Sequence, residues 1–160
     1  MNYPTLVLFT VGIAAIVAAG CTTTSPATTQ YATASPSGSV SVVIHSDITH
    51  YTVIMSSAPG IGLSSNITGP LPAGNLSYVW KTDYGHFLGW SAPDYTVREL
   101  GTTVTGNRTK VYWTYLGENE SISRPPVHIT LAVIDPASGA TLGNAEQTIG
   151  WDENDTAVIE

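Results

Sequence analysis

VHITLAVI, residues 127–134, is the stretch that decides the fold class. Successive side chains of a strand point to opposite sides. The alternation therefore places four apolar residues on one face: Val127, Ile129, Leu131 and Val133. Residues 135–139, DPASG, have the residue types of a turn. An apolar face followed directly by a turn predicts a half-buried strand in an antiparallel sheet.

Short β-branched and aromatic runs, separated by Gly, Pro, Asn and Asp, recur through residues 39–160. We expect turns at 83–85 and 135–139 and strands at 39–45, 51–56, 76–82, 87–90, 95–100, 110–116 and 127–134, with closing strands over 140–151. Within LSYVWKT, residues 76–82, Leu76, Tyr78 and Trp80 share a face. The pattern predicts an all-β fold, a single antiparallel sandwich of about 120 residues.

Two stretches resemble PKD-type and immunoglobulin-like domains. Residues 78–85, YVWKTDYG, are similar to the PKD strand in which a Trp precedes a turn, and residues 127–139 are similar to the late strand with its D-x-x-x-G turn. The resemblance implies a two-sheet sandwich over roughly residues 39–151 with Trp80 buried. A plain immunoglobulin-like sandwich outside the PKD family is the alternative.

The amino terminus reads as an export signal. Residues 6–19, LVLFTVGIAAIVAA, are almost entirely apolar. About 15 apolar residues form a helix of roughly 22 Å, shorter than the ~30 Å hydrocarbon core that a spanning helix crosses. This length is typical of a signal peptide. We therefore expect residues 1–20 to be cleaved on export.

Residues 18–21, AAGC, resemble the lipobox of prokaryotic lipoproteins. The resemblance implies that Cys21 is lipidated and becomes the first residue of an exported, membrane-anchored chain. Cys21 is the only cysteine, so the exported domain forms no internal disulfide. The alternatives are a chance cysteine behind a signal peptide and an uncleaved signal anchor.

Residues 21–38 continue as a stalk rich in Thr, Ser, Ala and Pro and without charge. Such a segment buries too little apolar surface to offset its ordering entropy, which predicts a disordered tether. At ~3.1 Å per residue it would hold the following domain up to about 50 Å from the membrane. The composition also suits an O-glycosylated stalk.

Five of the six asparagines after the signal begin an N-x-S/T sequon: Asn66, Asn75, Asn107, Asn119 and Asn154. Chance would give about one or two. We expect all five in loops or the tail, where they could carry N-glycans. A lipobox with N-glycans points toward an archaeal surface, and the alternative is that Asn and Thr are simply ordinary loop residues.

Two groups of polar residues and one single histidine are candidates for chemistry. His45, Asp47 and His50 have ligand side chains but are interpreted as a surface turn without a second ligand cluster. Asp83 and His86 lack the local signature of a nucleophilic site, and His128 is expected on the outer face of its strand. We therefore predict neither an enzyme nor a cofactor.

The acidic tail is the metal candidate that we retain. Asp152, Asn154 and Asp155 supply the hard oxygen ligands that Ca²⁺ prefers, although the run lacks EF-hand spacing. The alternative is a solvated acidic end.

Aromatic residues offer the other functional interpretation. Six are candidates for stacking on sugar faces: Tyr84, Trp90, Tyr95, Tyr112, Trp113 and Trp151. Tyr112 and Trp113 are adjacent, so on a strand they point to opposite faces. Trp90, Tyr112 and Trp113 are the predicted ligand-binding residues, and the alternative is that these rings fill the core.

Charge restricts the partners. The net charge of −7 argues against nucleic acid and acidic membrane surfaces. Residues 60–62, GIG, are interpreted as a loop and make no phosphate-binding motif. The leading hypothesis is a non-catalytic surface spacer, adhesion or assembly module of the cell envelope, facing an envelope protein or polysaccharide. The alternative is a carbohydrate- or other ligand-binding lipoprotein.

Overall fold

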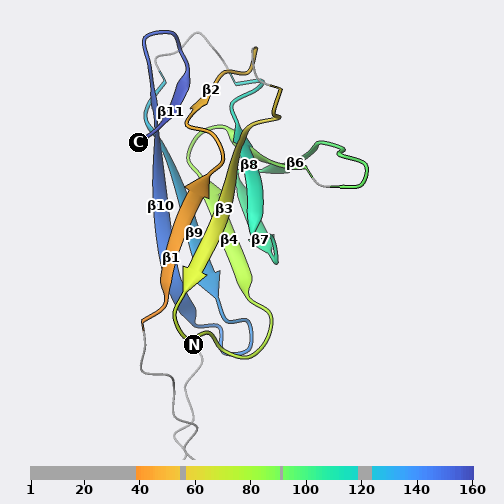
Figure 1. Cartoon of the computed structure of the whole chain (residues 1–160), viewed down its shortest axis with the longest axis vertical. Helices are drawn as coiled ribbons and strands as arrows, with labels where there is room; N and C mark the ends of the chain where they lie inside the picture. Colours follow the sequence, from red (N-terminus) through yellow and green to blue (C-terminus); the bar gives the residue numbers. More distant parts are fainter. Residues whose placement is uncertain (1–38, 55–56, 91, 119–123) are drawn as a thin grey trace, which may run out of the picture. The chain divides into compact units, whose positions relative to one another are not determined.

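The computed structural model describes residues 39–160 except 55–56, 91 and 119–123. The chain is all-β, with two antiparallel sheets packed as a sandwich (Figure 1). The strands are β1 Ser41–Ser46, β2 His50–Tyr51, β3 Ile61–Thr68, β4 Ser77–Thr82, β5 His86–Gly89, β6 Arg98–Gly101, β7 Thr103–Gly106, β8 Lys110–Thr114, β9 Val127–Ile134, β10 Thr141–Trp151 and β11 Ala157–Ile159. The predicted fold class is therefore confirmed.

Sheet A has the strand order β1-β3-β8-β5-β6, and sheet B has the order β2-β11-β10-β9-β4-β7. The two segments that resemble PKD-type domains lie on neighbouring strands, because β4 pairs with β9 and places Trp80 opposite Leu131. The predicted signal peptide, Cys21 and the stalk lie outside the described residues. In the described ranges no helix has the length and hydropathy to cross a membrane.

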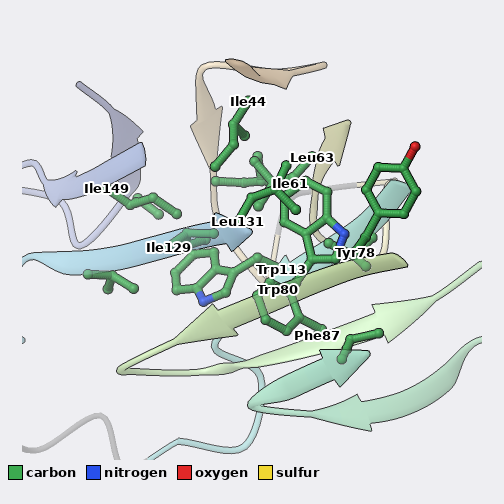
Figure 2. Close-up of a cluster of buried hydrophobic side chains, with 14 of the residues drawn as sticks. Ile44, Ile61, Leu63, Tyr78, Trp80, Phe87, Trp113, Ile129, Leu131 and Ile149 are labelled. Carbon is green, nitrogen blue, oxygen red and sulfur yellow. The ribbon is translucent and has the colours of Figure 1, made fainter. Parts of the chain in front are cut away.

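The core lies between the sheets and follows the alternation read from the sequence. On β9 the side chains of Val127, Ile129, Leu131 and Val133 are buried, whereas His128 and Thr130 are exposed. Figure 2 shows Ile129 and Leu131 among the apolar side chains around Trp80 and Trp113. Both indoles are fully buried.

Each buried indole N–H has a backbone partner. Trp80 Nε1 donates to the carbonyl oxygen of Arg108 over 3.0 Å, and Trp113 Nε1 donates to that of Tyr84 over 2.8 Å. A buried donor without a partner would cost about 1–3 kcal/mol, so these bonds allow large indoles to occupy the core.

The expected strand at residues 51–56 is wrong. Only His50 and Tyr51 pair, as β2, and the chain turns at Val53 and Ile54. The interpretation of residues 60–62 as a loop is also wrong, because β3 begins at Ile61 and pairs with both β1 and β8. The polar SSNIT end of β3 hides this strand from pattern reading, since long-range pairing stabilises it.

The sequence pattern did not predict two short strands, and it predicted several strands where the structure has one. β7 and β11 were not expected, and the region 140–151, predicted as several closing strands, contains the single long strand β10, Thr141–Trp151. β7 is a four-residue edge strand against β4, and β11 pairs with β10 after a hairpin. Both strands are too short for their pattern to indicate them in isolation.

Candidate functional site

Adjacent aromatic residues of β8 face opposite sides of sheet A. Trp113 points into the core and is 0% exposed. Tyr112 pairs with Gly62 on β3 and Leu88 on β5, and lies on the outer face. The opposite orientation is as predicted, but Trp113 is withdrawn as a ligand-binding residue because its ring reaches no surface.

Three rings form a cluster on the outer face of sheet A, which we call the aromatic strip: Trp90, Tyr95 and Tyr112. The centroids of Trp90 and Tyr112 are 5.4 Å apart, and those of Trp90 and Tyr95 are 5.7 Å apart. Both contacts have edge geometry, which aromatic pairs favour. The structure thus brings together two of the three predicted ligand-binding residues.

Exposure increases along the strip. Tyr112 is 9% exposed, Trp90 is half-buried directly after β5, and Tyr95 is 60% exposed in the loop between β5 and β6. That loop projects from the side of the sandwich beyond β6 (Figure 1). Tyr95 was an aromatic candidate but was not among the predicted ligand-binding residues, because no local pattern sets its distance from Trp90.

Tyr95 has a backbone φ of +48°. A bulky residue in this left-handed region is an outlier, and such a conformation costs on the order of 1–3 kcal/mol. The ring therefore reaches the strip at the expense of backbone strain.

An ion pair borders the strip at Tyr112. Lys110 Nζ lies 4.7 Å from the centroid of the Tyr112 ring and 3.2 Å from Asp47 Oδ2. Hydrogen bonding to the Tyr112 side chain, and then to Asp47, raises the pKa of Lys110. Asp47 Oδ1 accepts a hydrogen bond of 2.7 Å from the backbone N–H of Gly62. This border is therefore polar, and the Gly62 N–H orients the Asp47 carboxylate.

The histidine and aspartate candidates of the first group lie at the surface, where Asp47 has hydrogen-bond partners within the fold. His45, Asp47 and His50 lie exposed in and around a surface turn, as interpreted from the sequence. Among the described residues, no three His, Cys, Asp or Glu side chains are arranged to hold a metal ion. Asp47 instead accepts hydrogen bonds from the backbone N–H of Gly62 and from Lys110 Nζ.

Asp83 and His86 do not form a pair. Asp83 Oδ1 accepts a hydrogen bond of 2.8 Å from the backbone N–H of His128, whereas His86 Nδ1 lies 3.9 Å from Glu118. His128 itself is exposed, as expected for the outer face, and its Nδ1 is 3.1 Å from Glu146 Oε1. Asp83 thus fixes the start of β9.

The acidic tail forms the hairpin between β10 and β11. Asp152 Oδ1 accepts hydrogen bonds of 2.8 Å from the backbone N–H groups of both Asn154 and Thr156. Hydrogen bonding to the Thr156 backbone chiefly lowers the pKa of Asp152. The candidate calcium ligands Asp152, Asn154 and Asp155 are therefore parts of a turn whose first carboxylate already has backbone partners.

Four sequons lie among the described residues, and one of them is misplaced by the sequence interpretation. Asn75, Asn107 and Asn154 are exposed outside strands, as expected. Asn66 is exposed but lies within β3, paired with Val43 of β1, so its predicted loop position is wrong. Asn119 lies outside the described residues.

Two other aromatic candidates belong to a cluster at one end of the sandwich. Trp151 contacts Tyr84 and Tyr115, with centroid distances of 6.2 and 5.0 Å, and its indole donates to the carbonyl oxygen of Pro125. The guanidinium carbon of Arg124 lies 4.6 Å from the Tyr115 ring and 4.8 Å from the Trp151 ring. These rings pack against one another and against a cation, so they stabilise the fold.

The outer face of sheet B carries a shallow hollow. Its floor includes Val79, Ala132 and Ile134, and its rim includes Lys81 and Glu146. It is lined by no aromatic side chain. The aromatic strip therefore offers the more specific surface chemistry of the two faces. No protein-family model, curated protein or solved structure matches the chain.

Proposed function

We propose that this chain is an exported, lipid-anchored protein of the cell envelope whose sandwich binds a partner, as an adhesion or assembly module, and is not an enzyme. The aromatic strip is the observation that carries this proposal, because Tyr95 displays a large ring on a projecting loop. A contiguous patch of apolar side chains at the surface is a candidate interaction site. The likeness of residues 78–85 and 127–139 to PKD-type and immunoglobulin-like domains, on paired strands, supports the same class of module.

The use of the acidic side chains supports binding over catalysis. Asp47, Asp83, Asp135 and Asp152 each accept a hydrogen bond from a backbone N–H. A general acid or base must instead exchange protons with a bound substrate. These carboxylates order turns and strand starts.

A glycan is the ligand class that the strip favours. A sugar ring has an apolar C–H face that packs on aromatic side chains, while its hydroxyls need polar partners at the edge. The strip offers Trp90 and Tyr95 for the first requirement. Lys110 and Asp47 beside Tyr112 offer a donor and an acceptor for the second.

Binding is tested with the purified full chain on a glycan array and on fractionated envelope. We expect saturable glycan binding that Trp90→Ala abolishes, since this change removes the ring that joins Tyr95 to Tyr112. The matched control is Lys81→Ala with Glu146→Ala, which alters the rim of the sheet B hollow and should leave binding intact. Glycan binding lost only in that control would move the site to the other sheet.

Two further outcomes decide between kinds of partner. Capture of one purified envelope protein, without glycan binding, would favour an assembly module over a lectin-like one. Turnover of any glycan or peptide by the purified chain would contradict the non-catalytic proposal.

Anchoring is tested separately at Cys21. We expect Cys21→Ser to move the exported protein from the membrane fraction to the soluble fraction, because this change removes the only thiol. The mass of the amino-terminal peptide should show acylation of the wild type. An unmodified Cys21 on a chain that stays in the membrane would support the uncleaved signal anchor.

A further inference from the structure

The carboxylate of Asp47 is fixed beside the only cation that contacts the aromatic strip among the described residues. The backbone N–H of Asp47 donates to the carbonyl oxygen of Gly62 over 2.9 Å, and the side chain of Asp47 accepts from the N–H of Gly62. This two-way bond holds Asp47 Oδ2 at 3.2 Å from Lys110 Nζ. The positive charge of Lys110 is therefore neutralised by the Asp47 carboxylate, which its hydrogen bond to Gly62 orients.

The remaining charges around the strip add no positive excess. Glu99 is exposed opposite Leu88, which itself lies opposite Tyr112, so its carboxylate is on the same face. Asp94 lies in the loop that carries Tyr95, accepts a hydrogen bond from Thr96, and is attracted by Arg98. The whole chain carries a net charge of −7. An anionic ligand would thus approach a surface without net attraction for it.

We propose that the aromatic strip takes neutral glycans, and that Asp47 is a specificity-determining residue that excludes uronate and sulfated glycans by neutralising Lys110. The inference rests on the proposed glycan-binding function and adds the ligand class. Specificity of this kind comes from a repulsive element as much as from attraction. Lys110 keeps N–H donors beyond the one directed at Asp47, and these can reach sugar hydroxyls.

Two variants separate the Lys110 ammonium group from its neutralising carboxylate, each by a different change. Asp47→Asn removes the charge while the amide oxygen can still accept the hydrogen bond from Gly62. Gly62→Ala places a Cβ in the space that the Asp47 carboxylate occupies, so the carboxylate must move although Asp47 itself is unchanged. Lys110→Met is the matched control, because it keeps an apolar stem over Tyr112 and removes the charge.

The experiment measures binding of the full chain to paired neutral and uronate glycans of the same linkage, at low and at physiological salt. We expect the wild type to prefer the neutral glycan by about tenfold at low salt, because Asp47 neutralises Lys110 while Glu99 and the net charge of −7 repel a uronate. Asp47→Asn and Gly62→Ala should raise uronate affinity about tenfold relative to neutral-glycan affinity. Lys110→Met should keep the preference for the neutral glycan, and salt should weaken the gain in the two releasing variants.

The outcomes separate the inference from the function on which it rests. A wild type that binds uronate as tightly as the neutral glycan would overturn the inference alone. So would an Asp47→Asn variant with an unchanged ratio, provided that Gly62→Ala also leaves it unchanged. A wild type that binds no glycan of either kind would overturn both the inference and the proposed glycan function.

Discussion

Tyr112 and Trp113 are neighbours in the chain, yet Tyr112 lies on the outer face of sheet A and Trp113 lies in the core. The period of two in β8 separates them by the thickness of the sheet. Trp113 is fully buried with its indole N–H bonded to Tyr84, and Tyr112 contacts Trp90 and Lys110. One ring therefore contributes to folding and the other to the proposed site.

We expect Trp113→Ala to lower the free energy of unfolding by about 3–5 kcal/mol, the usual range for emptying a buried aromatic position. Trp90→Ala removes a half-buried ring and should cost clearly less, because part of that ring already faces water. Urea denaturation of the full chain, followed by fluorescence, measures both. Equal losses for the two variants would show that Trp90 belongs to the core, contrary to its place on the outer face.

Tyr95→Asn separates backbone strain from the function of the ring. Asn tolerates the left-handed conformation that Tyr95 adopts at a φ of +48°. We therefore expect the free energy of unfolding to stay constant or to rise by up to about 1 kcal/mol, while glycan affinity falls. Tyr95→Phe keeps the ring and should bind like the wild type. If Tyr95→Asn retained full glycan affinity, Tyr95 would have no place in the site.

Acid should destabilise the domain through its turn aspartates. Hydrogen bonding to Ser138 chiefly lowers the pKa of Asp135, and hydrogen bonding to the Thr156 backbone chiefly lowers that of Asp152. The folded state then binds fewer protons than the unfolded state, so this stability is present above the usual Asp pKa of about 3.9. It is lost as the pH falls through the lower folded pKa.

Urea midpoints between about pH 6 and pH 2.5 measure this effect. The midpoint should fall in the acidic part of the range, and Asp135→Asn with Asp152→Asn should flatten that part of the curve. A double variant that keeps the full wild-type slope would assign the acid sensitivity to other groups.

Sequon use should follow local structure. In a host that performs N-glycosylation, we expect modification at Asn75, Asn107 and Asn154, which lie in exposed turns or loops. Asn66 should remain largely unmodified, because its backbone lies in the β1–β3 ladder. Peptide mass mapping of the purified chain measures occupancy at each site, and Asn66→Gln should leave the intact mass of the glycoprotein nearly unshifted. High occupancy at Asn66 would indicate glycosylation before β3 forms.

Much of the fold is readable from the sequence because alternation is a local property. The buried faces of β4 and β9 and the turn at residues 135–139 follow from neighbouring residues alone. β3 is different. Its polar second half resembles a loop, and it is a strand because Ser41–Ser46 and Lys110–Trp113 supply its hydrogen-bond partners.

The candidate site was only partly predictable for the same reason. The sequence by itself determined an all-β domain and the opposite directions of Tyr112 and Trp113, since these depend on a period of two along one strand. The burial of Trp80 was implied by the resemblance to PKD-type and immunoglobulin-like domains. Only the tertiary structure decided that Trp90 and Tyr95 meet Tyr112, and that Asp47 meets Gly62 and Lys110. Those contacts join residues from different strands and loops, and their distances are set by strand pairing and register, which no single stretch of the chain specifies.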